Sequence, residues 1–177
     1  TKKIDQWAKE NTNKLLVKKL IQWHLHRQWL EIKQFAKQKG VKLIGDIPFY
    51  VSRDSVDVWS NKSLFSISEE GALIYQSGVP PDYFSSNGQL WGTPVYQWSE
   101  HLKTEFDWWK KRFKRQFELV DVLRLDHFRA LSAYWRVDGN AKNAITGEWI
   151  KSPGSELLNS LKDILNKETL PIIAEDL

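Results

Sequence analysis

Three acidic residues each lie at the end of a short, mostly apolar run of the sequence. They are Asp46, Asp126 and Glu175, which end or follow the runs 41–46, 119–126 and 170–174. If these runs are neighbouring parallel strands, the carboxylates meet at the edge where barrel enzymes carry their catalytic groups. Two adjacent carboxylates are the minimal apparatus for breaking a glycosidic bond. Such residues also cap helices, so each one alone is a weak indication of catalysis.

Two further residues beside Asp126 suit the same chemistry. Arg124 lies two positions before Asp126, so both side chains leave the strand on one face. A guanidinium in that place would keep the carboxylate ionised and oriented. His127 follows directly, whereas two other histidines fall within a predicted helix and His101 begins another. The four histidines are not spaced as metal ligands, and the chain has no cysteine, so we predict no metal site.

Three stretches with helical spacing separate the apolar runs. Residues 14–39, 102–118 and 155–167 carry apolar side chains along one face, which predicts amphipathic helices. In the first, the apolar stripe consists of Ile21, Leu25, Trp29, Ile32 and Phe35. The alternation of helix and strand predicts an α/β protein with a parallel sheet. An open doubly wound sheet and a (β/α)8 barrel both fit. No GxGxxG loop follows a strand, which weakens the dinucleotide-binding interpretation.

The stretch 47–100 interrupts this alternation. It contains glycine and proline throughout, is rich in aromatic residues and lacks a helical period. Loops longer than about 15 residues are usually functional or disordered. We expect an ordered excursion with short strands near 64–67 and 72–75.

The composition narrows the classes of protein. The chain has 177 residues, of which 41% are apolar and 27% are charged. This composition is typical of a soluble globular domain rather than of a disordered chain. The absence of cysteine excludes disulfides and thiol nucleophiles. The net charge of +4 is scattered, so we predict no nucleic-acid partner, and no apolar run is long enough to predict a membrane partner. The ten tryptophans are consistent with two roles, packing in a hydrophobic core and stacking on sugar rings.

Several segments together resemble one enzyme family. The segment 124–130 (RLDHFRA) resembles the Arg-Ile-Asp-His-Phe-Arg-Gly motif of the 4-α-glucanotransferases, also called amylomaltases, in glycoside hydrolase family 77 of the α-amylase superfamily. Further similar segments are 45–51 (GDIPFYV), 54–59 (DSVDVW), 78–84 (GVPPDYF), 88–92 (GQLWG) and 174–177 (AEDL). The chain departs from the family at Ala130, where glycine is usual, and at Thr93, where asparagine is common.

The resemblance implies a partial (β/α)8 TIM barrel of about three β/α repeats, with a long loop excursion after the first strand. Residues 1–177 would be the central fragment of a catalytic barrel, and 47–100 an inserted loop or lid region. The remaining repeats and a third catalytic carboxylate would lie outside this chain. We therefore expect the fragment alone to be inactive.

The resemblance also implies roles for individual residues. Asp126 would be the nucleophile and Glu175 the acid/base of a retaining double displacement, with carboxyls about 5–5.5 Å apart. The residues expected to bind the sugar at the cleavage point are Asp46, Arg124 and His127. Those expected on a lid over the glucan are Asp82, Tyr83, Phe84, Gln89 and Trp91.

The implied substrates are α-1,4-glucans and maltooligosaccharides, with the 4-hydroxyl of glucose or another glucan as acceptor. No cofactor and no obligate protein partner are implied, and the expected location is the cytoplasm or a plastid stroma. An α-glucan hydrolase of the same superfamily is one alternative. A non-catalytic glucan-binding protein is the other, disfavoured because Asp126 and Glu175 are both present.

Overall fold

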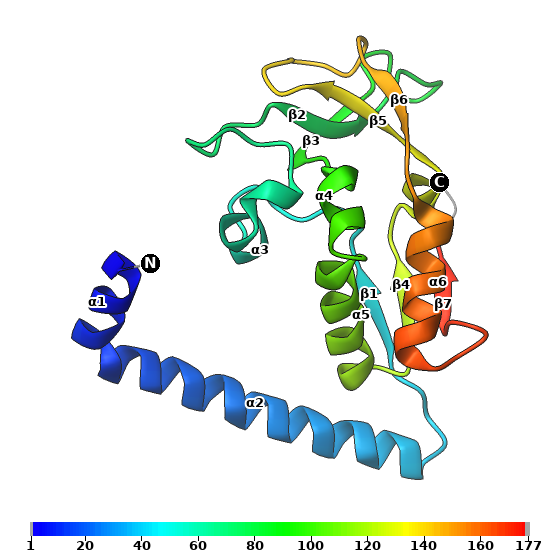
Figure 1. Cartoon of the computed structure of the whole chain (residues 1–177). Coiled ribbons are helices and arrows are strands. Elements are labelled where there is room, and N and C mark those ends of the chain that lie inside the picture. The colour runs from blue at the N-terminus through cyan, green and yellow to red at the C-terminus, as the bar shows by residue number, and fades with distance from the viewer. Residues whose placement is uncertain (1, 176–177) are drawn as a thin grey trace.

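The structure is a computed structural model, and it describes residues 2–175 (Figure 1). The helices are α1 (Lys2–Glu10), α2 (Thr12–Gln38), α3 (Val56–Ser60), α4 (Trp98–Lys103), α5 (Asp107–Leu119) and α6 (Gly154–Leu165), with short 3₁₀ helices η1 (Lys62–Leu64) and η2 (Phe128–Leu131). The strands are β1 (Ile44–Ile47), β2 (Tyr75–Val79), β3 (Gln89–Pro94), β4 (Val122–Leu125), β5 (Ala133–Asp138), β6 (Glu148–Lys151) and β7 (Ile172–Ala174). No helix within residues 2–175 is both long enough and apolar enough to cross a membrane.

The first sheet is parallel and has the strand order β1-β4-β7. Its register pairs Asp46 with Arg124, and Leu125 with Ala174. All three strands come from the apolar runs, which confirms the predicted α/β class with a parallel sheet. The strands are shorter than the runs: residues 41–43 form the connection that enters β1, and residues 120–121 form the connection from α5 into β4.

One face of this sheet is packed against helices. Leu123 and Leu125 of β4 are fully buried in a cluster with Phe113 of α5 and with Leu157 and Leu161 of α6. Figure 1 shows α5 and α6 running alongside β1, β4 and β7. Because side chains alternate along a strand, Arg124 of β4 is left on the opposite face.

The second sheet was not predicted. It is antiparallel, with the order β3-β2-β5-β6, and lies beyond one end of the parallel sheet (Figure 1). Two of its strands come from the stretch 47–100 and two from the connection between β4 and α6. Strands β2 (YQSGV) and β3 (QLWGTP) carry polar residues and glycine, so alternation of apolar residues does not reveal them.

The short strands expected near 64–67 and 72–75 are wrong in extent. Leu64 ends the helix η1, and only isolated bridges join Phe65 to Tyr96 and Ile67 to Leu73. The strand near Ala72 starts instead at Tyr75, because its partner is β5, more than 50 residues further along the chain. Local sequence does not reveal such long-range pairing.

The helix expected over 102–118 is broken into α4 and α5. Glu105 and Phe106 adopt left-handed backbone angles, with φ of 49° and 61°. The amide of Phe106 donates to the carbonyl of His101, which closes the end of α4, and the Phe106 ring is buried. The buried ring thus goes together with a left-handed backbone conformation that residues other than glycine rarely adopt.

The helix expected over 14–39 is confirmed as α2, but its apolar stripe is not packed. Ile21, Leu25, Ile32 and Phe35 are all exposed, and within α2 only Ala36 is buried. The helix extends away from the two sheets (Figure 1). Polar contacts tie it to the end of α5, where Trp29 Nε1 donates to the Leu119 carbonyl at 2.7 Å.

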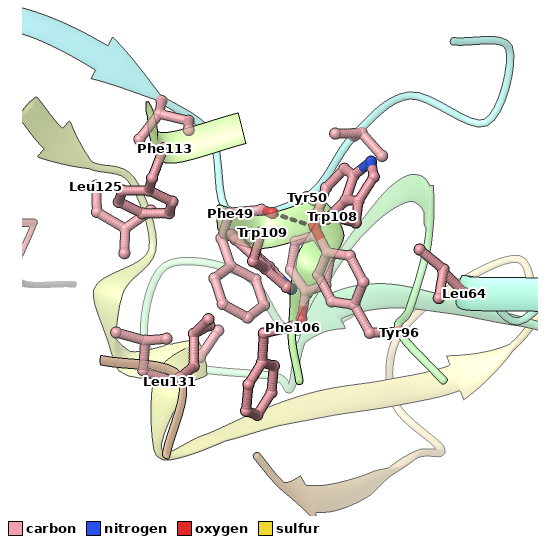
Figure 2. Close-up of a cluster of buried hydrophobic side chains, with 14 of the residues drawn as sticks. Phe49, Tyr50, Leu64, Tyr96, Phe106, Trp108, Trp109, Phe113, Leu125 and Leu131 are labelled. Atoms are coloured by element: carbon pink, nitrogen blue, oxygen red, sulfur yellow. Dashed lines mark hydrogen bonds between the residues drawn. The ribbon is translucent and has the colours of Figure 1, made fainter. Parts of the chain in front are cut away.

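An aromatic cluster fills the space between α5 and the segment that follows β1 (Figure 2). Trp109 is fully buried, with ring centroids 5.4 Å from Phe49 and 5.1 Å from Tyr96. The Tyr96 hydroxyl donates to the Phe49 carbonyl at 2.5 Å. Several tryptophans and tyrosines therefore serve the core, and this core supports the loop next to the candidate site.

Candidate active site

Asp126 and Glu175 come directly after the ends of two adjacent strands. Because Leu125 of β4 pairs with Ala174 of β7, the residues that follow them lie beside each other and on one face. Backbone hydrogen bonds continue the ladder: the Asp126 amide donates to Ile47 O at 3.0 Å, and the Glu175 amide to Leu125 O at 3.1 Å. Rigid strand ends thus position both carboxylates.

Arg124 contacts all three acidic residues predicted at strand ends. Its Nη1 lies 2.9 Å from each carboxylate oxygen of Asp46, and its Nη2 contacts Glu175. The same Nη2 lies 3.5 Å from Oδ1 of Asp126. One cation thus faces three carboxylates, so the site has excess negative charge suited to a positively charged transition state.

Glu175 has a second partner. Its Oε2 accepts a hydrogen bond of 2.7 Å from the backbone amide of His127. The Glu175 side chain is also the least exposed of the three carboxylates. Its orientation is therefore set from two sides, by the guanidinium of Arg124 and by the turn at His127.

His127 occupies that turn with a left-handed backbone, φ 53°. Its ring is buried, and neither ring nitrogen has a hydrogen-bond partner among the described residues. Burial lowers the pKa of His127, an effect that the nearby Asp126 opposes and Arg129 reinforces. A neutral imidazole can both donate and accept a hydrogen bond, but the two ring nitrogens are buried in this structure, so the sugar-binding role of His127 stays a prediction.

One of the predicted lid residues, Trp91, lies next to His127, and a second, Gln89, contacts Trp91. The Trp91 ring meets the His127 ring edge-on, with centroids 4.8 Å apart. Trp91 Nε1 donates to Gln89 Oε1 at 3.3 Å, so Gln89 belongs to the same group. Strand β3 carries both residues.

The other three predicted lid residues lie in the turn between β2 and β3. Oδ1 of Asp82 accepts from the backbone amides of Phe84 and Ser85, at 2.8 and 2.7 Å, which orders the turn. The rings of Tyr83 and Phe84 pack edge-on against each other and are 98% and 93% exposed. The structure does not bring these two rings against the carboxylates, and their binding role stays a prediction.

Tyr50 is a site neighbour that the sequence analysis did not single out. Its ring centroid lies 6.1 Å from that of His127 and 6.0 Å from that of Trp91. Its hydroxyl is buried without a hydrogen-bond partner among residues 2–175, and burial raises its pKa well above the usual 10. The available signal was its place in the segment 45–51, four residues after Asp46.

The described residues contain no group of three or more histidine, aspartate and glutamate side chains arranged to hold a metal ion. The side chains that the site brings together are the carboxylates of Asp46, Asp126 and Glu175, the guanidinium of Arg124 and the imidazole of His127. Paired carboxylates on adjacent strand ends are an arrangement for acid/base and nucleophilic attack on a glycosidic bond.

Comparisons with known proteins agree with this interpretation. The chain is 44% identical to a 4-alpha-glucanotransferase of Synechocystis over 172 residues, which is 97% of this chain and 34% of that protein. It is 46% identical to a 4-alpha-glucanotransferase of Clostridium butyricum over 160 residues, 90% of this chain and 32% of that protein. The chain thus spans about a third of the length of the curated relatives it matches.

A solved structure is similar over nearly the whole chain. The amylomaltase from Streptococcus agalactiae in complex with acarbose superposes with a TM-score of 0.92 at 39% identity, covering 99% of this chain and 35% of that one. The family model described as 4-alpha-glucanotransferase matches residues 1–177. The resemblance in the sequence motifs is thereby confirmed, and the chain belongs to the 4-α-glucanotransferase family, glycoside hydrolase family 77.

Proposed function

We propose that this chain is the central segment of a longer 4-α-glucanotransferase. The whole enzyme would transfer segments of α-1,4-glucan to the 4-hydroxyl of glucose or of another glucan. The observation that carries the proposal is the pairing of Leu125 with Ala174, which leaves Asp126 and Glu175 side by side on adjacent strand ends. Family membership adds support, because the relatives from Synechocystis and Clostridium butyricum bear the name of this activity.

In the proposed mechanism, a carboxylate oxygen of Asp126 attacks the anomeric carbon of the donor glucan. The bond from that carbon to the leaving glycosidic oxygen breaks, and protonated Glu175 gives its proton to that oxygen. In the second displacement, Glu175 takes the proton of an acceptor 4-hydroxyl, whose oxygen attacks the anomeric carbon and releases Asp126. Two inversions at one carbon retain the α configuration.

Three neighbouring residues would bind the sugar at the cleavage point. Arg124 already contacts Asp46 and Glu175, so it can orient both, and Asp46 can accept from sugar hydroxyls. His127 lies beside Asp126, and its buried ring nitrogens have no hydrogen-bond partner among residues 2–175. The positive charge that develops on the sugar ring would meet the excess negative charge of this group.

We also propose that the turn carrying Asp82, Tyr83 and Phe84 closes over bound glucan, together with Gln89 and Trp91. The exposed rings of Tyr83 and Phe84 have apolar surface free for stacking on sugar. An aromatic lid can exclude water while a sugar acceptor still binds, which would favour transfer over hydrolysis. If replacing both rings by alanine left the ratio of transfer to hydrolysis unchanged, this part of the proposal would fail.

The architecture proposed for the whole enzyme is a (β/α)8 barrel, of which this chain supplies about three repeats and 47–100 the inserted lid region. Support comes from three parallel strands in sequential order joined by helices, and from the superposition on about a third of an amylomaltase. The face that bears Arg124 would be the barrel interior. We expect no transferase activity from the 177 residues alone, since most of that interior would be missing.

The experiment uses the full-length protein that carries this chain, with Asp126→Ala as the matched variant. Each is incubated with maltotriose, and the products are separated by chromatography. From the unchanged protein we expect glucan oligomers both shorter and longer than the substrate. From the variant we expect no products. Glucose and maltose without longer products would indicate an α-glucan hydrolase. Absence of turnover in both proteins, with retained glucan binding, would indicate a non-catalytic binding protein.

A further inference from the structure

Arg112 is a partly buried cation that the proposed mechanism does not use. It lies in the middle of α5, and its guanidinium carbon is 5.2 and 5.3 Å from the ring centroids of Trp108 and Trp109. Burial lowers the pKa of Arg112, whereas the nearby Tyr96 and Asp57 raise it. An arginine stays protonated at any ordinary pH, so this is a charge kept in a largely apolar environment.

The hydrogen bonds of Arg112 go to the backbone that follows β1. Its Nη2 donates to the Pro48 carbonyl at 2.7 Å and its Nη1 to the Phe49 carbonyl at 3.3 Å. The Phe49 carbonyl also accepts from the Tyr96 hydroxyl, as Figure 2 shows. Two successive peptide planes are thus held by one rigid fork of donors.

These two carbonyls lie between parts of the candidate site. Asp46 is two residues before Pro48, and its carboxylate binds Arg124. The carbonyl of Ile47, in the peptide that joins it to Pro48, accepts from the Asp126 amide at 3.0 Å. A rotation of the two peptide planes on either side of Pro48 would therefore disturb the backbone that holds Asp126, the proposed nucleophile.

The same segment also orients Tyr50. The Tyr50 ring lies one residue beyond the Phe49 carbonyl and contacts the rings of Trp91 and His127. The backbone angles at Phe49 set the direction of that ring. Arg112 thus contacts the segment 47–50. This segment follows Asp46, accepts a hydrogen bond from the Asp126 amide and carries the Tyr50 ring beside His127.

We propose that Arg112 is a positioning residue for glucan transfer: by binding the Pro48 and Phe49 carbonyls it holds the end of β1 against Asp126 and the Tyr50 ring against His127. This role rests on the proposed function, but its structural part is independent of it. The guanidinium acts through the backbone and touches neither proposed catalytic carboxylate. Small displacements of reacting groups can cost about 100-fold in rate, so the effect should be measurable.

The test compares Arg112→Met and Arg112→Lys in the full-length protein with two controls. Arg115→Met removes an arginine three residues further along α5, where the side chain binds Glu118 and His26 near the surface. Leu161→Ala opens a buried position in α6, outside the segment after β1. It controls for general destabilisation.

Two measurements are made on each variant. The first is kcat and KM for maltotriose disproportionation well below the unfolding temperature. The second is hydrogen exchange of the Asp126 amide, which needs no activity. For Arg112→Met we expect kcat to fall at least about 10-fold with KM changed less than about 3-fold, because orientation rather than sugar binding is lost. We expect the Asp126 amide to exchange at least about 10-fold faster, and Arg112→Lys to lie between.

The outcomes separate this inference from the proposed function. Wild-type values for both readouts in Arg112→Met would overturn the inference, and so would equal effects in Leu161→Ala. If the wild-type protein shows no transfer but the Asp126 amide exchanges faster only in the Arg112 variants, the proposed function fails and the positioning of Asp126 stands. Loss of kcat together with faster exchange, absent from Arg115→Met, would support both.

Discussion

The two faces of the parallel sheet differ in what surrounds them, although the same three strands form both. On one face, Leu123 and Leu125 are fully buried against α5 and α6. On the other face, Arg124 contacts Asp46 and Glu175, and the apolar side chain of Ile44 is 63% exposed. The packed face supplies stability by removing apolar surface from water, and the open face presents charged groups to a ligand.

This difference shows how a short strand can carry both stability and chemistry. Because side chains alternate, the packed residues Leu123 and Leu125 fix the backbone from which Arg124 and Asp126 project. A catalytic group gains precision when rigid elements hold it. Mutations on the two faces should therefore have separable effects on activity and on stability.

The largest effect is expected on the open face. Asp126→Asn keeps the shape of the side chain but removes the nucleophilic oxygen, so kcat of the full-length protein should fall by about 10⁴-fold or more. The unfolding midpoint should hardly move, since one of three carboxylates facing a single cation is lost. Steady-state transfer assays and thermal unfolding check this. Asp54→Asn, an exposed carboxylate outside the site, is the control.

On the packed face, Leu123→Ala should reduce the free energy of unfolding by about 2–5 kcal/mol, because it leaves a cavity among fully buried side chains. Denaturant unfolding measures the change. The same substitution at Leu102, an exposed position of α4, is the control and should cost much less. Equal losses at both positions would contradict the assignment of a packed face.

The aromatic cluster beside the site also contains a titratable group that should make stability depend on pH. His101 is fully buried among aromatic rings, and its Nε2 donates to the Leu64 carbonyl at 3.2 Å. Burial lowers the pKa of His101 to about 4, below the unfolded value of about 6.5. Between these values the unfolded chain binds the proton more readily, so stability falls as pH decreases from 6.5 towards 4.

The expected loss from His101 approaches about 3 kcal/mol near pH 4. Unfolding curves of the wild-type chain and of His101→Phe, recorded between pH 7 and 4, measure it. The variant should lose this part of the pH dependence, whereas His24→Phe, at an exposed histidine, should retain it. The interpretation of a buried neutral histidine would be wrong if all three proteins lost stability in parallel.

The smallest effect is expected for Ile44→Thr in the 177-residue chain. Ile44 is exposed on the same face as Asp46, so the free energy of unfolding should change by less than about 0.5 kcal/mol. In the full-length protein, the proposed barrel interior would bury this side chain, and the loss should exceed about 1 kcal/mol. A small loss in both proteins would argue against the partial-barrel proposal.

Much of the parallel sheet and of the site followed from local sequence patterns. The apolar runs predicted the strands, and the acidic residues at their ends predicted which side chains meet. The antiparallel sheet escaped prediction because β2 pairs with β5 across more than 50 residues and carries few apolar side chains. Tyr50 escaped because its contacts with Trp91 and His127 join three separate segments.

Spacing and residue type, which are local properties, determined the order of the elements in the parallel sheet. The sequence motifs also indicated the family, and the resemblance they carry implied most of the candidate site residues. The tertiary structure decided which apolar faces are buried: α5 packs Trp109 and Phe113, whereas the equally regular stripe of α2 stays exposed. It also decided that Arg124 contacts three carboxylates. Burial and charge pairing depend on two surfaces meeting, and no single segment specifies its partner.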